Sequence, residues 1–117
     1  MKKITFLGNY TPEETMIMFK CLDNYAKKQD IYINYIHLPS NLNLENNEII
    51  KIIKENKVDI FRFGQGFYKE VKKELFKNLD KIFNITKINE YQRKFCKRGG
   101  KLICVPDAID GLVLFYN

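Results

Sequence analysis

The sequence is poor in the residues that build metal sites and nucleotide sites. It contains one histidine, His37, no tryptophan, and three cysteines, Cys21, Cys96 and Cys104, none of them in a Cys-x-x-Cys pair. One histidine and an odd number of scattered cysteines argue against a metal site and favour cysteines that serve as small buried apolar residues. Neither a Walker A nor a Gly-x-Gly-x-x-Gly pattern occurs, so a nucleotide site has little support.

Long apolar segments are also missing, because no stretch approaches the ~20 apolar residues of a membrane span. Met1-Lys2-Lys3 resembles the basic head of a signal peptide, but the apolar run Ile4–Leu7 is shorter than an h-region of about 7–15 residues. As written, the chain is therefore expected to carry no export signal, which keeps a cytoplasmic location open.

What is present suits one folded domain. The chain has 117 residues, of which 45% are hydrophobic, enough for a sizeable core in a single domain spanning 1–117. The net charge of +6 suits anionic partners, but lysine is also the ordinary surface residue of a sequence rich in Lys, Asn and Ile.

Apolar segments alternate with amphipathic ones along the chain. Strands are expected at 3–8, 31–38, 58–63, 101–105 and 112–116, and helices at 12–28, 46–56, 67–73 and 89–97. The first helix has the clearest signals, since Thr11 can cap it, Pro12 suits its first position and Glu14 completes a capping box. The residues expected on its inner face are Met16, Phe19, Leu22 and Ala26. The alternation predicts an α/β fold with a three-layer, mainly parallel sheet and helices on both faces.

In such sheets ligands bind beyond the carboxyl ends of the strands, where the strand order switches. This rule selects three segments, at 8–11, 64–68 and 106–110. The first places amides and a hydroxyl at a helix N-terminus, which suits an anion or a hydroxylated ligand, or else only caps the helix. In the second, Gly64 and Gly66 allow close backbone approach and Gln65 offers hydrogen bonds, or the segment is only a turn.

Arg62 is the sharpest single candidate. A charged residue in a predicted central strand is costly unless it is paired or opens to a cleft, and alternation places Asp59 on the opposite face. Tyr10 could stack on a sugar ring, although aromatic residues at such positions are often core. Asp110 offers hydrogen bonds to ligand hydroxyls or forms a turn, and its pairing with Asp107 for catalysis lacks partner residues.

A basic cluster lies in the second half of the chain, with no acid between Glu90 and Asp107. Its members are Arg93, Lys94, Lys97, Arg98 and Lys101. The cluster either contacts nucleic acid or forms a solvated helix face whose cations are favourable near the helix C-terminus. We favour the solvated face and expect no nucleic-acid partner.

Several segments follow one another in an order that is familiar from one family. They are Ile4–Gly8, Pro12–Glu14, Val58–Phe61 followed by Gly64–Gly66, Leu75–Ile82, and Gly100–Asp107 followed by Leu112–Asn117. In this set and order the chain resembles the first lobe of an extracellular solute-binding protein of an ABC transporter, of the sugar-binding group. Ile103-Cys104 stands where the family has Tyr-Gly, and Asp107 replaces a common aromatic residue, which weakens sugar stacking there.

The resemblance implies one lobe of a periplasmic-binding-protein fold, with flavodoxin-like strand order, whose second lobe is absent from this chain. It implies binding of a small solute, a sugar, and delivery to an ABC permease outside the cell or in the periplasm, with no catalytic residues, metal or cofactor. The residues that would line the cleft are Asn9, Tyr10, Arg62, Gln65 and Asp110.

The end of the chain keeps another interpretation open. A Gly99-Gly100 turn leads into the apolar strand expected at 101–105, and a second apolar strand is expected at Leu112–Tyr116. This last strand either folds back onto the sheet or leaves an apolar edge for a partner. The alternative to solute binding is therefore a stand-alone flavodoxin-like interaction or regulatory module that self-associates through Leu112–Tyr116.

Overall fold

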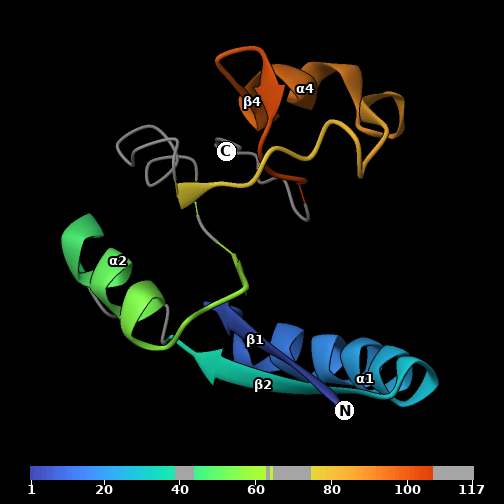
Figure 1. Cartoon of the computed structure of the whole chain (residues 1–117), viewed down its shortest axis with the longest axis vertical. Helices are drawn as coiled ribbons and strands as arrows, with labels where there is room; N and C mark the ends of the chain where they lie inside the picture. Colours follow the sequence, from blue (N-terminus) through green and yellow to red (C-terminus); the bar gives the residue numbers. More distant parts are fainter. Residues whose placement is uncertain (39–43, 63, 65–74, 107–117) are drawn as a thin grey trace, which may run out of the picture. The chain divides into compact units, whose positions relative to one another are not determined.

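The computed structural model describes residues 1–38, 44–62, 64 and 75–106. The chain divides into two compact units, Met1–Glu70 and Val71–Asn117 (Figure 1). We describe each unit by itself, and the expectation of a single domain stays a prediction. None of the helices in the described ranges is long and apolar enough to cross a membrane.

The first unit is built on a three-stranded parallel sheet. Its elements are β1 (Lys2–Gly8), α1 (Pro12–Gln29), β2 (Ile31–His37), α2 (Asn46–Glu55) and β3 (Ile60–Phe61). The strand order is β2-β1-β3, and Phe6 of β1 lies opposite both Tyr35 and Ile60. This is the order of the first three strands in a flavodoxin-like sheet.

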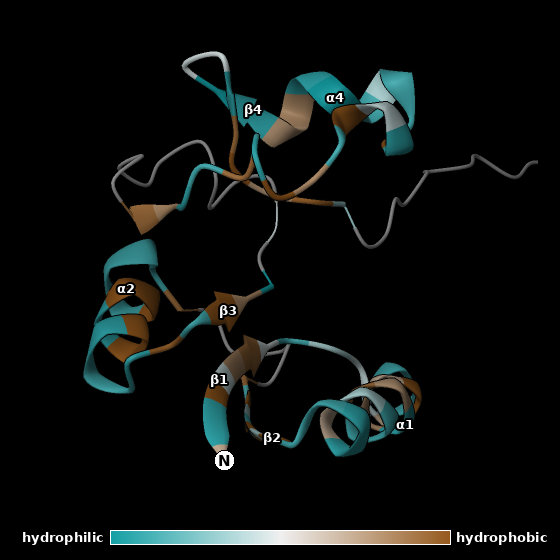
Figure 2. Ribbon diagram, turned by 45° about the vertical axis from the view of Figure 1, so that its right-hand side comes forward, coloured by the Kyte–Doolittle hydropathy of each residue, from teal (hydrophilic) through white to brown (hydrophobic). Residues whose placement is uncertain are grey.

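The helices α1 and α2 lie on opposite faces of this sheet (Figure 2). The first crossover runs from β1 outward to β2, and the second returns past β1 to β3, so right-handed crossovers place their helices on opposite faces. Each helix buries an apolar residue, Ala26 of α1 and Ile53 of α2, and β1 between them buries Leu7. The predicted α/β fold with a parallel sheet flanked by helices is thus confirmed.

The start of α1 follows the predicted capping box. Thr11 Oγ1 accepts a hydrogen bond from Glu14 N at 3.2 Å, and Glu14 Oε1 accepts one from Thr11 N at 2.9 Å. The predicted inner face is wrong at Met16, which is 67% exposed. Phe19 is 47% exposed but faces the sheet as predicted, because its ring meets the Tyr35 ring of β2 edge-on at a centroid distance of 5.1 Å. The less exposed side carries Thr15, Met18, Leu22 and Ala26. Thr15 can face inward because its hydroxyl is satisfied by donating to Thr11 O at 2.8 Å.

The strand β3 is shorter than the predicted strand 58–63. At its start Thr5 N donates to the carboxylate Oδ2 of Asp59 at 2.9 Å instead of to a strand carbonyl. Backbone bonds from Asp59 N to Thr5 O and from Arg62 N to Leu7 O flank the two strand residues, both at 2.9 Å. The side chain of Asp59 therefore replaces one ladder bond and shortens the regular strand.

The second unit consists of short secondary-structure elements around a small core. They are η2 (Ile85–Lys87), a 3-10 helix, then α4 (Glu90–Cys96), β4 (Lys97–Arg98) and β5 (Lys101–Leu102). Asn89 Oδ1 caps α4 by accepting from Tyr91 N at 3.0 Å, which confirms the predicted short helix within slightly narrower bounds. The core consists of Ile88, Cys96 and Leu102, with Leu79, Phe83, Ile85 and Cys104 packed against it.

The segment expected as a further strand of the parallel sheet at 101–105 instead turns back on its neighbour. β5 pairs antiparallel with β4, with Lys97 opposite Leu102. Gly99 and Gly100 have φ of 60° and 76°, the two positive values that a type I′ hairpin turn requires. A strand joined by so tight a turn pairs antiparallel, because a parallel neighbour needs a crossover of a dozen or more residues. The helix predicted at 67–73 and the strand at 112–116 lie outside the described residues.

Candidate functional site

Three of the predicted cleft residues come together at the carboxyl ends of β1 and β3. Arg62 follows β3 directly, and Asn9 and Tyr10 follow β1. The guanidinium Nη1 of Arg62 donates to Asn9 Oδ1 at 3.3 Å, and its Cζ lies 4.3 Å from the centroid of the Tyr10 ring. Tyr10 is only 5% exposed, so its ring also belongs to the core. Neighbouring parallel strands in register bring these residues together from opposite ends of the unit's sequence.

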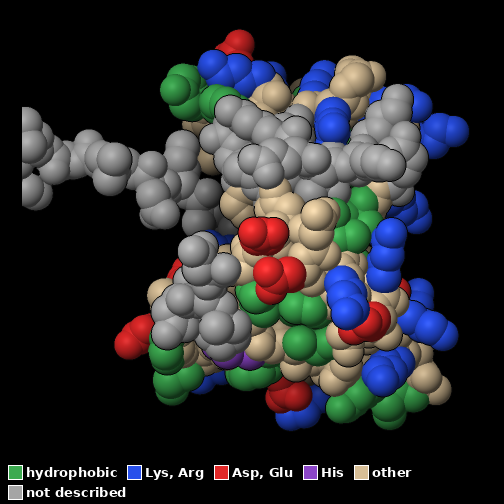
Figure 3. All heavy atoms as spheres, turned by 90° about the vertical axis from the view of Figure 1, so that its left-hand side faces the viewer, with side chains coloured by type: hydrophobic (Ala, Val, Ile, Leu, Met, Phe, Trp, Pro, Cys, Tyr) green, Lys and Arg blue, Asp and Glu red, His purple; other side chains and the backbone are tan. Residues whose placement is uncertain are grey.

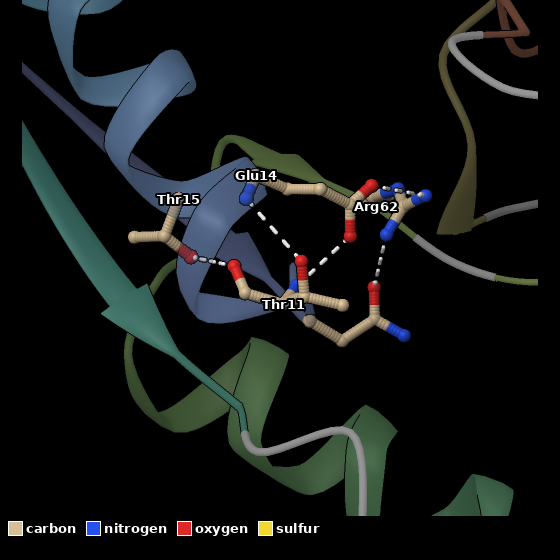
Figure 4. A network of polar contacts seen from close by, with 5 residues as sticks. Thr11, Glu14, Thr15 and Arg62 are labelled. Atoms are coloured by element: carbon tan, nitrogen blue, oxygen red, sulfur yellow. Dashed lines mark hydrogen bonds and ion pairs between the residues drawn. The ribbon is translucent and has the colours of Figure 1, made fainter.

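The capping box of α1 adds a fourth residue that sequence reasoning used only as a cap. Glu14 Oε1 is bound to Thr11 N, while its Oε2 lies 3.9 Å from Arg62 Nη2 (Figure 4). Glu14 is therefore the acidic neighbour of Arg62, whereas Asp59 faces Thr5. An acid in the first turn of a helix after a parallel strand lies above the carboxyl edge of the sheet, and this placement is the signal that could have identified Glu14.

The local electrostatics disfavour an anion at the N-terminus of α1. The amide groups of Thr11 and Glu14 are both taken by the capping box, and the Glu14 carboxylate already supplies negative charge there. In segment 8–11 Thr11 therefore caps the helix, and an anion is disfavoured there, whereas a hydroxylated ligand stays a prediction. Among the described residues of the site, the Arg62 charge is correspondingly compensated by Glu14.

Gly8 allows a close approach between β1 and a tyrosine of β2. A Cβ built on Gly8 would lie 2.7 Å from Tyr35 Oη and 3.0 Å from Tyr10 Cδ2. Tyr35 Oη is buried and has no hydrogen-bond partner among the described residues. Burial raises the pKa of Tyr35, and the nearby Thr15, the backbone of Tyr10 and the Arg62 charge partly oppose that effect. The Tyr35 side chain is therefore neutral and packs against the strand that leads into the site.

The other two predicted cleft residues, Gln65 and Asp110, lie outside the described residues. So do Phe67, Tyr68 and Asp107, which the sequence placed nearby. The site described here consequently rests on Asn9, Tyr10 and Arg62.

The basic cluster of the second unit is partly engaged within its own unit. Arg93 Nε donates to Ile88 O at 3.0 Å and Arg93 Nη2 to Thr86 O at 3.4 Å, while Lys94 Nζ lies 5.1 Å from the Tyr91 ring centroid. On the face of the molecule drawn in Figure 3, basic side chains stand at several separate places, with acidic ones between some of them. These contacts support the solvated, structural interpretation of the cluster.

Cys96 and Cys104 are covered in the same unit. Burial raises the pKa of both thiols, that of Cys104 to about 12, and each cysteine is a free thiol. Both thiols stay protonated near neutral pH, which suits small apolar core residues and not nucleophiles. Across the described ranges, no three His, Cys, Asp or Glu side chains gather closely enough to hold a metal ion.

The sequence matches no protein-family model and no curated protein. The structure shows an α/β fold for the first unit.

Proposed function

We propose that the protein binds a small, uncharged, hydroxylated solute at the carboxyl edge of its parallel sheet, without making or breaking bonds in it. The observation that carries the proposal is the position of Arg62. This arginine lies where the strand order switches, between β1 and β3, held by the Asn9 amide over the Tyr10 ring. Ligands of open α/β sheets bind at this kind of position.

The preference for an uncharged solute follows from Glu14. The carboxylate compensates the Arg62 charge, so an anion would gain little net attraction. The Arg62–Glu14 pair is long and Glu14 is 44% exposed, so it contributes at most ~1 kcal/mol and ligand hydroxyls can replace it at small cost. Asn9, Arg62 and Glu14 together offer donors and acceptors that suit a polyol or a sugar.

The carbohydrate class and the link to an ABC transporter come from the ordered motifs of the sequence. They agree with a binding edge that contains polar groups around an aromatic ring. Because a single lobe encloses only part of a ligand, we expect weak affinity.

The test is an NMR titration of the full chain with a panel of monosaccharides, oligosaccharides and polyols, with citrate and phosphate as the anionic comparison. Amide signals of Asn9, Tyr10 and Arg62 should shift with one of the neutral compounds and not with the anions. Arg62→Gln should weaken that binding about tenfold or more, through loss of charged hydrogen bonds, while Arg93→Gln in the second unit serves as the matched control. If none of the neutral compounds shifts these signals, the proposal fails.

A further inference from the structure

The outer edge of β2 is the longest strand edge that no described strand pairs with. β2 ends the sheet order β2-β1-β3. Leu38 N donates to Gly8 O at 2.8 Å, and in a parallel ladder this means that the even-numbered residues of β2 bond to β1. The residues whose backbone N–H and C=O groups point to the outer edge are therefore Ile31, Ile33, Tyr35 and His37.

The sequence of β2 and its described pairing have none of the charges, prolines or bulges with which proteins protect exposed strands. β2 reads Ile-Tyr-Ile-Asn-Tyr-Ile-His, with no proline and no Lys, Arg, Asp or Glu, in a chain that has 34 such charged residues (20 basic and 14 acidic). It pairs with β1 over all seven residues without a bulge. A regular, uncharged strand edge is a template on which another strand can form hydrogen bonds.

We propose that two copies of this chain pair through β2, antiparallel, about a twofold axis at Asn34. Asn34 is the central residue of β2, and an axis there fixes the register of the two strands. Ile33 then lies opposite the partner's Tyr35, and Ile31 opposite the partner's His37, so all four outward-facing residues form hydrogen-bonded pairs. Tyr32 lies opposite the partner's Ile36, an aromatic and β-branched pair of the kind that stabilises antiparallel strands.

The surroundings of the edge favour a second copy over a charged partner. A surface cavity of about 730 Å³ lies between α1 and β2, and its charged lining residues are Lys20, Asp23, Lys27 and Asp30. The charges of the two lysine and two aspartate side chains cancel, although the chain as a whole carries +6, so these side chains add no net repulsion between identical edges.

Exposed apolar side chains also line this cavity. Tyr32 is 53% exposed and Phe19 47%, and both line the cavity. Pairing would remove part of this surface from water and add to the backbone hydrogen bonds. The inference uses the edge of the sheet and is independent of the solute site at its carboxyl ends.

The first experiment measures the oligomeric state of the full chain by sedimentation equilibrium from low micromolar to near-millimolar concentration. The wild type should show a reversible monomer–dimer equilibrium. Tyr32→Lys should raise the dimer dissociation constant about tenfold, because two apolar cross-strand pairs are lost and two like charges are added. Tyr25→Lys is the matched control, since Tyr25 is 55% exposed on α1 and does not line the cavity. A monomer at every concentration, or a dimer that Tyr32→Lys leaves unchanged, would overturn the proposal.

The second experiment reads the register and does not depend on the lysine variant folding. In a Cys21→Ser background, Asn34→Cys should form an intermolecular disulfide with copper–phenanthroline and oxygen as the oxidant, because Asn34 faces its own copy. Tyr32→Cys should not cross-link to itself under the same conditions. Equal cross-linking of the two variants, or none in Asn34→Cys, would exclude this register.

Discussion

The first unit spreads its stabilising interactions along a sheet, whereas the second gathers them in one small core around Ile88, Cys96 and Leu102. β1 and β2 pair over seven residues, and β4 and β5 over two. The buried apolar residues of the first unit, Leu7, Tyr10, Ala26 and Ile53, lie on β1, in the loop after it, on α1 and on α2. In the second unit Leu102 is 1% exposed, its amide donates to Asp80 Oδ1 at 3.0 Å, and its carbonyl accepts from Leu79 N at 2.7 Å.

This contrast suggests that a single truncation should damage the second unit more than the first. Leu102→Ala is expected to lower the free energy of unfolding of the second unit by about 2–5 kcal/mol, because it removes the most buried side chain of a small core. Hydrogen exchange followed by NMR should show faster exchange across residues 79–104. Exchange in β1 should stay as in the wild type.

The control for this prediction is Ile82→Ala. Ile82 is in the same unit but 65% exposed, so its truncation should change stability by no more than about 0.5 kcal/mol. Equal acceleration of exchange in β1 and β5 on Leu102→Ala would show that the two units unfold together, and the contrast between them would be wrong.

The difference between the units also explains how far sequence reasoning reached. The first unit was predictable because its signals are local and mutually consistent: Thr11, Pro12 and Glu14 fix the helix start, and the strand–helix alternation fixes the parallel sheet. Its errors arose from tertiary contacts, since Met16 gave way to Thr15 on the inner face and the Asp59 side chain shortened β3. In the second unit, two glycines with positive φ reversed the chain and overrode an apolar pattern that resembled one more parallel strand.

The candidate site was predictable only where topology fixes it. The rule about carboxyl ends of parallel strands selected Asn9 and Tyr10, and the cost of a charge in a central strand selected Arg62. The structure brings these three side chains into contact. The roles of Glu14 and Tyr35 depend on side-chain directions across neighbouring strands, which a single sequence does not encode in a short pattern. The place of Glu14 in the first turn of α1 could have indicated an acid at this edge of the sheet, but its contact with Arg62 could not be derived from the sequence.

The close approach at Gly8 gives a test of the packing within the first unit. Gly8→Ala should destabilise that unit by about 1–3 kcal/mol, because the new Cβ would lie 2.7 Å from Tyr35 Oη and 2.9 Å from Tyr35 Cε2. Tyr35→Phe removes the nearer atom, so the penalty should be smaller in the double variant when measured by urea denaturation.

Gly64→Ala is the matched control for that substitution, since no atom of the described residues lies within 4 Å of a Cβ built on Gly64. It should cause no loss of stability. A Gly8→Ala variant as stable as Gly64→Ala, or a penalty that Tyr35→Phe does not reduce, would contradict the packing described for this edge of the sheet.

The last comparison of the two units is the rate at which their own cysteines are alkylated, and it needs no substitution. Cys21 is exposed on α1, whereas Cys96 is buried and Cys104 partly so. With a pKa of about 12, the Cys104 thiol is ionised to about one part in ten thousand at pH 8, so iodoacetamide should label Cys21 first in the folded protein. Peptide mass spectrometry reads the order, and labelling of Cys104 as fast as Cys21 would exclude its burial.

The same thiol makes the stability of the second unit depend on pH in one direction. The pKa of Cys104 is raised above its ordinary value of 9.0, so folding favours the neutral thiol. Its contribution to stability is fully present below about pH 9 and is lost as the pH rises toward about 12, because the unfolded chain ionises first. In urea denaturation, the unfolding midpoint of the second unit should therefore fall less at alkaline pH in Cys104→Ala than in the wild type. Cys21→Ala should leave that fall unchanged.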